Sequence, residues 1–394
     1  MTAPRALVVT VVHHPEDARI RHRQVAALLD AGWRVTYAAP FHAYAVTPTP
    51  CPGLTHVDLP RARGRHRLRA LAGARSVLRR DAAGHDVVLL HDPELLLAAR
   101  GLRLPPVVWD VHEDTAASTT LKPWLPGPAR GPVARMVGRF ERGAEDRVHL
   151  LLAEEEYRSR FRRPHPVVPN TTTVPASVPP PDEPRVVYVG HLSRARGVEE
   201  MVELGRLLHD RTAGRLRVQL VGAADTAAAA ALADAPPGVE WLGFRPHNEA
   251  MRVLDGALAG LSLLHDEPNY RVSQPTKVVE YLAHGVPAVT TALPRAATLV
   301  DGVGAGVVVP FRDGRADPGE VADLVVALDR NPAVRGRMAA RGRAHAAAHL
   351  DWRRQAPAFV GRLAAVAGLG PVAPAGPPPA LSGSGSWSAR TVRG

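Results

Sequence analysis

Apolar and polar positions alternate along the chain in blocks the length of strands and helices. Between residues 6 and 39, an apolar run, a polar loop, an amphipathic stretch ending at Gly32 and a second apolar run follow one another. Short buried strands alternating with helices are typical of the βαβ unit of a parallel sheet. The same order starts again at residue 185. The pattern therefore predicts an α/β protein with two domains.

A proline-rich stretch separates the two halves. The segment TTTVPASVPPPDEP, which starts at Thr171, cannot hold a regular helix or a central strand. The predicted division is a first domain at 1–170, a linker at 171–184, a second domain at 185–345, a carboxyl-terminal helix at 346–367 and a disordered tail at 368–394 rich in Pro, Gly, Ala and Ser.

Composition narrows the class of protein. A chain of 394 residues with 45% apolar content can bury two cores of ordinary size. The single cysteine, Cys51, excludes an intramolecular disulfide. No run reaches the roughly 18 apolar residues of a membrane span, and the start reads as a first strand rather than a signal peptide. We expect a soluble, cytoplasmic protein.

The formal net charge of +11 permits nucleic acid, an anionic membrane or an anionic substrate as partner. Aromatic content is only 5%, and no nucleic-acid motif is present, so we expect no nucleic-acid partner. The segment RARGRHRLRALAGARSVLRR, residues 61–80, predicts a basic helix with an apolar stripe. It is either a peripheral contact with an anionic membrane or a solvated helix face covering a sheet.

Two polar clusters follow predicted strands in the first half. The strand in DVVLLHD ends on His91 and Asp92, and the strand in PVVWDVHED ends on His112 and Glu113. Ligands of open α/β sheets bind at the carboxyl ends of strands, so these side chains predict a binding site. A metal site is the competing interpretation. The spacing matches no standard ligand motif and no D-x-D pair occurs, so we expect no metal.

The loop after the first strand carries His13, Asp17 and Arg19. Taken alone, these residues fit a polar loop in which an Asp caps the next helix.

Two predicted helix starts in the second half suit phosphate oxygens, because free backbone N–H groups there lie beside a cation. One follows a strand ending at Gly190, with Arg196 just before the helix. The other carries Lys277 in its first turn, and Glu280 lies one turn further on. The competing interpretation of Lys277 and Glu280 is an exposed i,i+3 pair. No G-x-G-x-x-G motif occurs, which argues against a nicotinamide-dependent oxidoreductase.

The segments HHPEDARIRHRQVAALLDAGWRVT, HDPELL, WDVHED, GHLSRARG and SQPTKVVEYLAHGVPAV occur in this order. Together they resemble the retaining GT-B-fold glycosyltransferases of family 4 (glycosyl transferases group 1), and the resemblance covers roughly residues 5 to 365. It implies two Rossmann-like domains that face each other across a cleft, with the last helix crossing back to the first domain.

The resemblance also assigns roles. Glu280 matches the second glutamate of an E-x7-E motif and would hold the ribose, whereas Val272 stands where the first glutamate is expected, with Asp266 and Glu267 nearby. Arg196 takes a lysine position that stabilises the diphosphate, together with Lys277, and His112 would contact the donor sugar. The implied donor-binding residues are Gly190, His191, Arg196, Gly197, Ser273, Pro275, Thr276, Lys277 and Glu280. The implied acceptor-binding residues are His13, Asp17, Arg19, His91, Asp92 and Glu113.

The expected activity is metal-independent transfer of a sugar from a nucleoside-diphosphate sugar to a hydroxyl group, with retention of configuration. The sequence does not distinguish whether the acceptor belongs to the biosynthesis of a polysaccharide, a glycolipid or a natural product. A nucleotide-sugar epimerase with the same fold and a non-catalytic sugar-nucleotide or membrane-binding scaffold are the alternatives. The first would turn over donor without acceptor, and the second would bind donor without transferring it.

Overall fold

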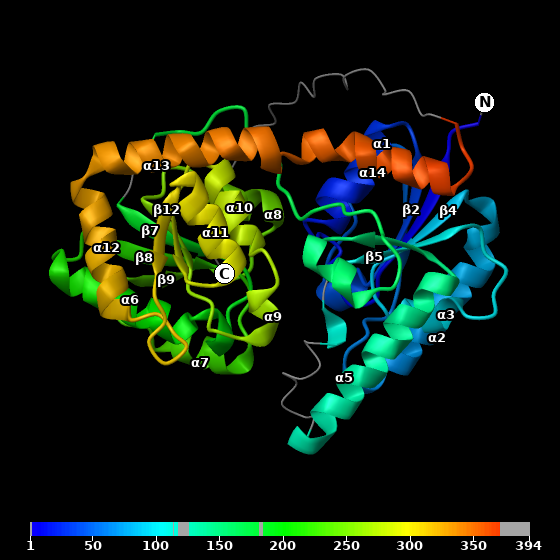
Figure 1. Cartoon of the computed structure of the whole chain (residues 1–394), viewed down its shortest axis with the longest axis horizontal. Helices are drawn as coiled ribbons and strands as arrows, with labels where there is room; N and C mark the ends of the chain where they lie inside the picture. Colours follow the sequence, from blue (N-terminus) through cyan, green and yellow to red (C-terminus); the bar gives the residue numbers. More distant parts are fainter. Residues whose placement is uncertain (1, 113, 117–125, 181–183, 371–394) are drawn as a thin grey trace, which may run out of the picture.

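The computed structural model describes residues 2–112, 114–116, 126–180 and 184–370, which form two α/β lobes lying side by side (Figure 1). The predicted acceptor residue Glu113 lies outside the described residues. So does the predicted tail from residue 371 onward.

The amino-terminal lobe is built on a parallel sheet. Among the described residues, six strands follow the order β3-β2-β1-β4-β5-β6. Their bounds are Arg5–Val9 for β1, Arg34–Ala39 for β2, Leu54–Asp58 for β3, Val87–Leu90 for β4, Val107–Val111 for β5 and His149–Leu152 for β6. The helices of this lobe are α1 at Ala26–Asp30, α2 at Arg67–Asp81, α3 at Leu95–Ala99, α5 at Gly127–Arg142 and α14 at Trp352–Val366. A π-helical segment, Ile20–Val25, leads into α1.

Helices cover both faces of this sheet, which explains why its strands are continuous apolar runs. In β1, Leu7 and Val9 belong to the core beneath α2, whereas Ala6 and Val8 belong to the core beneath α1 and α14. Successive side chains of a strand point to opposite faces of the sheet, and here both faces are buried beneath helices.

The carboxyl-terminal lobe repeats this architecture. Its strands, counted over the described residues, follow the order β12-β11-β10-β7-β8-β9 and are all parallel. The strands are β7 at Arg185–Val189, β8 at Arg217–Val221, β9 at Val239–Trp241, β10 at Ala259–Ser262, β11 at Ala288–Thr291 and β12 at Gly306–Val309. The helices are α6 at Val198–Arg211, α7 at Thr226–Ala233, α8 at His247–Arg252, α9 at Pro268–Arg271, α10 at Thr276–Ala283, α11 at Pro294–Val303, α12 at Pro318–Arg330 and α13 at Pro332–His345.

The chain passes between the lobes twice, and the two passages are hydrogen-bonded to each other. The amide of Thr172 donates to the carbonyl of Leu350 (3.0 Å), and the amide of Trp352 donates to the carbonyl of Thr172 (2.8 Å). After the second passage, α14 lies on the amino-terminal lobe (Figure 1) and buries Phe359 and Leu363 fully in its core. The predicted two-domain α/β fold is therefore confirmed.

No helix of the described chain is both long enough and apolar enough to cross a membrane.

Candidate active site

A cleft of about 400 Å³ lies between the lobes, where the loops after β5 and β6 face the starts of α6 and α10. This is the edge at which open α/β sheets bind their ligands. The amino-terminal lobe contributes His112, Asp114, Glu154, Tyr157 and Asn170 to its lining. The carboxyl-terminal lobe contributes Arg196, Leu264, Asn269, Tyr270, Ser273, Gln274, Pro275, Thr276 and Lys277.

Lys277 lies in the first turn of α10, a helix that starts after the extended residue Pro275. Its side chain is buried, and Nζ lies 5.1 Å from the centre of the Tyr188 ring. Burial, followed by the neighbouring charge of Arg196, lowers the pKa of Lys277 to about 7. The ammonium group is therefore poorly stabilised without a bound anion.

Arg196 ends a short turn immediately before α6, and its guanidinium group contacts the hydroxyls of Tyr188 and Tyr270. The next residue, Gly197, has a φ of 81°, and a Cβ there would lie 2.3 Å from the carbonyl oxygen of Leu263. Only glycine fits this bend, which directs the start of α6 toward the cleft.

Within the described part of the chain, neither Arg196 nor Lys277 forms an ion pair with a carboxylate. Two cations without a carboxylate partner, each at a helix start, form a site for phosphate oxygens.

The other residues of this lobe that were predicted to bind the donor substrate lie close to Arg196 and Lys277. Thr276 is exposed at the first position of α10, and the Ser273 hydroxyl donates to the carbonyl of Asn269 (3.1 Å). Gly190 follows β7 beside Lys277, and the exposed His191 accepts a hydrogen bond at its carbonyl from the Tyr188 hydroxyl (2.7 Å).

The place of the expected first glutamate is taken by Val272, which is half-buried. Asp266 accepts from both Nε and Nη2 of Arg271 (2.6 and 2.7 Å) and does not line the cleft. Its carboxylate is therefore occupied within its own segment.

Glu280 does not line the cleft but faces the amino-terminal lobe. Its carboxylate lies 3.6 Å from Nη2 of Arg23, and both side chains are buried. Burial raises the pKa of Glu280, and the charge of Arg23 opposes that shift. Glu280 is therefore part of an ion pair that joins the two lobes.

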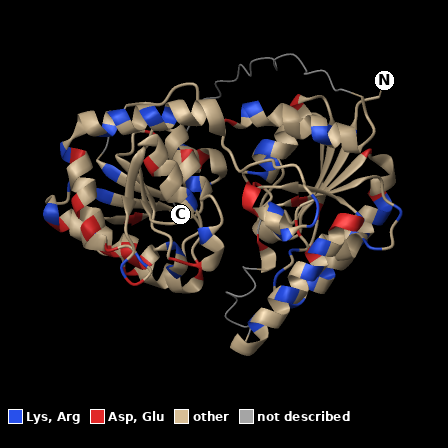
Figure 2. Cartoon of the chain, viewed as in Figure 1, with Lys and Arg blue, Asp and Glu red and all other residues tan. Residues whose placement is uncertain are grey.

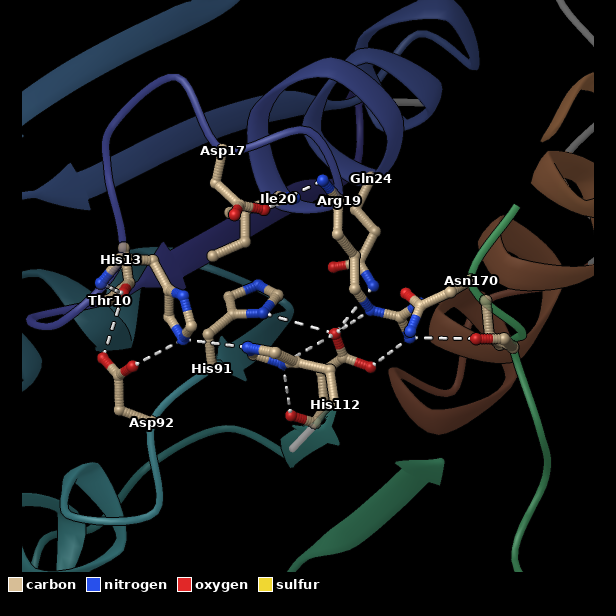
Figure 3. Close-up of polar contacts among 12 residues, drawn as sticks. Thr10, His13, Asp17, Arg19, Ile20, Gln24, His91, Asp92, His112 and Asn170 are labelled. Atoms are coloured by element: carbon tan, nitrogen blue, oxygen red, sulfur yellow. Dashed lines mark hydrogen bonds and ion pairs between the residues drawn. The ribbon is translucent and has the colours of Figure 1, made fainter. Parts of the chain in front are cut away.

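Four predicted residues of the amino-terminal lobe meet in one polar cluster (Figure 3). His112 Nε2 lies 2.8 Å from His13 Nε2, and His13 Nε2 lies 3.2 Å from the carboxylate of Asp92. The buried ring of His91 lies beside them, with its centre 5.7 Å from that of His112. These residues come from loops after β1, β4 and β5, which are neighbours in the sheet.

Arg19 is buried and bound within the lobe. Its Nε and Nη2 atoms donate to the two carboxylate oxygens of Asp110, at 2.7 Å each, and Nη1 donates to Asn170 (3.0 Å). Although burial opposes it, the charge of Arg19 holds the pKa of Asp110 well below its usual range. The predicted acceptor contact of Arg19 stays a prediction, and its guanidinium group is fully engaged by Asp110 and its neighbours in this structure.

Asp17 accepts hydrogen bonds from the amides of Arg19 and Ile20 (2.8 and 2.9 Å). This is the capping geometry of a helix start, one of the two interpretations that the sequence left open.

His91, Asp110 and His112 place one ligand atom each within 4.8 Å of one another, the spacing of a metal-binding group. The Asp110 carboxylate, however, already accepts from Arg19 and from Gln24 Nε2 (2.9 Å). A metal cation bound there would lie next to the positively charged guanidinium group of Arg19, so the surroundings do not suit a metal ion.

Sequence reasoning missed Glu154, Asn170 and Tyr270, which line the cleft, and Arg23. Glu154 follows β6 directly, so the strand-end rule that located His91 and His112 would have found it. Arg23 carries no local signal, because its partner belongs to the other lobe.

Residues 183–331 match the family profile described as Glycosyl transferases group 1. No curated protein matches the sequence.

Solved structures match over nearly the whole chain. Sucrose-phosphate synthase from Thermosynechococcus elongatus is 18% identical with a TM-score of 0.67, and the match covers 90% of this chain and 96% of that one. Anabaena Alr3699/HepE in complex with UDP-glucose is 12% identical with a TM-score of 0.65, covering 92% and 99%. AviGT4, a glycosyltransferase of avilamycin A biosynthesis, is 18% identical with a TM-score of 0.57, covering 93% and 98%. At these identities the similarity establishes a shared fold.

Proposed function

We propose that this chain is a group 1 glycosyltransferase that uses a nucleoside-diphosphate sugar as donor, because residues 183–331 match that family's profile and the whole chain shares the fold of solved glycosyltransferases. The proposed reaction transfers the sugar to a hydroxyl acceptor with retention of configuration and without a required metal. The observation that carries this proposal is the pair of neighbouring cations at the starts of α6 and α10, Arg196 and Lys277, which both line the cleft; burial and the charge of Arg196 lower the pKa of Lys277, and the charge of Glu280 opposes this only in part. The binding of UDP-glucose by the similar HepE structure supports it.

The chemistry follows from where charge develops. When the sugar–phosphate bond breaks, negative charge grows on the departing diphosphate. Arg196, Lys277 and the two helix starts stabilise that charge, and fixed donors of this kind contribute most when water is excluded. From the resemblance we assign the ribose contact to Glu280, although its carboxylate pairs with Arg23 in this structure and does not line the cleft, and we assign orientation of the donor sugar to His112. A front-face route, in which the departing phosphate helps deprotonate the acceptor, is the working mechanism.

We propose the division of labour implied by the sequence. Residues 185–345 bind the donor, and residues 1–170 bind the acceptor. The contacts predicted for His13, Asp17, Arg19, His91, Asp92 and Glu113 belong to that second proposal.

Peripheral contact with an anionic membrane, on the cytoplasmic side, is also part of this proposal. Arg63, Arg65, Arg67 and Arg69 are exposed at the start of α2, and Leu68 between them is 79% exposed. Basic side chains also lie along α5, which projects from the amino-terminal lobe (Figure 2). A basic surface with an exposed apolar side chain suits anionic headgroups. Co-sedimentation with phosphatidylglycerol vesicles but not with phosphatidylcholine vesicles, lost in Leu68→Asp, is the expected result. Equal sedimentation with both kinds of vesicle contradicts it.

The donor proposal is tested by thermal unfolding with a panel of UDP-, GDP- and TDP-sugars, with and without magnesium. We expect one nucleotide to raise the unfolding temperature independently of magnesium, because a ligand that binds only the folded state stabilises it. The shift should disappear in Arg196→Ala and Glu280→Ala. It should persist in the control Arg206→Ala, whose side chain pairs with Glu203 and Asp210 on the exposed face of α6. A folded protein that responds to none of the sugars overturns the proposal.

A further inference from the structure

Asp92, His13, His112 and Asp110 form a polar cluster in the amino-terminal lobe, and Asp92 and His112 approach the same atom of His13. Figure 3 shows the contacts among Asp92, His13 and His112. Asp92 Oδ1 lies 3.2 Å from His13 Nε2, which lies 2.8 Å from His112 Nε2. On the other side of its ring, His112 Nδ1 lies 3.1 Å from the carbonyl oxygen of Asp110 and 3.6 Å from its carboxylate. Only His112 of these four lines the cleft.

The partners of His112 fix the positions of its protons. Its Nδ1 atom faces two oxygens of Asp110, and both can only accept, so Nδ1 carries a hydrogen. In the neutral ring, Nε2 then has a lone pair. The 2.8 Å contact is a hydrogen bond only if His13 Nε2 donates to that lone pair. If His112 were also protonated at Nε2, two N–H groups would face each other and the contact would break.

Asp92 holds His13 in place by binding the loop that carries it. Its Oδ2 atom accepts from the hydroxyl of Thr10 (2.9 Å) and from the amide of Val12 (3.2 Å), and the Thr10 hydroxyl oxygen accepts from the amide of His13 (3.2 Å). Although burial opposes it, the hydrogen bond from His13 lowers the pKa of Asp92 to about 2. The carboxylate is therefore ionised at every working pH, and it shares the one hydrogen of His13 Nε2 with the lone pair of His112 Nε2 in a three-centre hydrogen bond.

We infer that His13 is a positioning residue for the transfer reaction. Asp110 sets the Nδ1–H form of His112, and the Nε2–H group of His13, shared with Asp92, binds the lone pair of His112 Nε2 and fixes the orientation of the ring at the cleft. His13 thereby acts through His112 and not through a contact of its own with the acceptor. This inference rests on the proposed function, because the role of His112 at the cleft comes from that proposal.

Loss of the hydrogen bond should therefore affect turnover more than donor binding. The cations that bind the diphosphate belong to the other lobe, and His13 touches neither. The other ionisable groups around the two histidines are Asp17, Asp92, Glu94, Asp110, His91 and Arg19.

The decisive variants are His13→Phe, which keeps a ring without a donor, and His13→Gln, which places an amide N–H near the position of Nε2. We expect His13→Phe to lower kcat by about 10-fold to 100-fold, the usual effect of losing a partner that orients a functional histidine, with donor Kd changed less than twofold. His13→Gln should recover most of this loss.

A second readout does not depend on activity. Proton–nitrogen correlation spectra of histidine-labelled protein, with the His112 signals assigned by their absence in His112→Gln, report which ring nitrogen carries the hydrogen. We expect the Nδ1–H form in the wild type and in both variants, because Asp110 is unchanged. In folded His13→Phe the His112 Nε2 resonance should shift, because that nitrogen loses its hydrogen-bond donor, and in His13→Gln it should shift less. Failure of the wild type to bind any sugar nucleotide would overturn the proposed function, and the spectra would still decide this inference. An unchanged His112 Nε2 resonance in His13→Phe, or an unchanged kcat in that folded variant, overturns the role of His13.

Discussion

The two sides of the cleft treat buried charge in opposite ways. In the amino-terminal lobe, the buried acids have hydrogen-bonded partners: Asp110 is bound by Arg19, and Asp92 by His13 and the loop after β1. In the carboxyl-terminal lobe, Lys277 and Arg196 lie close enough for one charge to lower the pKa of the other. Paired interior charges keep a lobe rigid, whereas cations without carboxylate partners leave a site ready for an anion. The first lobe therefore contributes a side of the cleft whose charges are already paired. The second lobe contributes a site with excess positive charge, which a bound diphosphate would neutralise.

The largest expected effect comes from breaking a pair in the first lobe. Replacement of Asp110 by alanine leaves the guanidinium group of Arg19 buried without its counter-ion, which should destabilise the lobe by about 3–5 kcal/mol. Urea unfolding followed by tryptophan fluorescence measures this, since Trp33 and Trp109 are buried in this lobe. The double variant Arg19→Met with Asp110→Leu is the control and should recover much of the loss. A change below about 1 kcal/mol for Asp110→Ala would contradict the comparison.

Neutralising a cation of the second lobe should increase the free energy of unfolding, whereas Asp110→Ala should decrease it. Lys277→Met removes a poorly stabilised charge, so the unliganded protein should gain up to about 4 kcal/mol near neutral pH, less what Glu280 loses with its neighbouring cation, while losing its response to sugar nucleotides. The pKa of Lys277 is lowered from 10.5 to about 7, so between these values the unfolded chain binds more protons and wild-type stability rises with pH. The advantage of Lys277→Met should be greatest below pH 7 and fade toward pH 10.5. A variant that is less stable than the wild type at pH 6 would show that Lys277 is not strained.

Binding of the sugar-nucleotide donor should be coupled to uptake of a proton by Lys277. At pH 8 most Lys277 side chains are neutral, and a bound diphosphate favours the charged form, so we expect uptake of up to one proton. Titration calorimetry at pH 8 in buffers of different ionisation enthalpy measures this uptake, which should vanish at pH 6. Lys277→Arg is the matched control, because arginine stays charged and should take up no proton. Binding heats that are independent of the buffer at pH 8 would exclude this coupling.

The smallest effect is expected where the two lobes meet. Arg23 and Glu280 lie 3.6 Å apart, longer than a hydrogen bond, so a double-mutant cycle with Arg23→Met and Glu280→Gln should give a coupling of about 1 kcal/mol. The exposed pair of Arg206 and Asp210 on α6 provides the baseline, expected at about 0.3–0.5 kcal/mol. Equal couplings for both pairs would mean that burial between the lobes adds nothing.

The sequence predicted the architecture and the edge of the sheet at which the polar residues gather. Parallel strands end at one edge, so His91, Asp92 and His112 had to lie near one another. The sequence did not predict their partners. Arg19 and Asp110 are 91 positions apart, and spacing along the chain does not say which side chains meet across a sheet. Asp17 had two interpretations that only the positions of the Arg19 and Ile20 amides distinguish. The contact between Arg23 and Glu280 depends on how the lobes are placed, which no local pattern encodes.

The position of helix α14 determines the order in which the two lobes can finish folding during translation. The amino-terminal lobe completes its core with Phe359 and Leu363, which are synthesised after the whole carboxyl-terminal lobe. While the ribosome translates residues 185–345, the face of the first sheet that carries Ala6 and Val8 is covered by α1 but lacks the part of its cover that α14 supplies. Exposed apolar surface of this kind makes nascent chains prone to aggregation. The first lobe to emerge is therefore the last to finish folding, and a nascent chain stalled before residue 352 would depend on chaperones to shield that face.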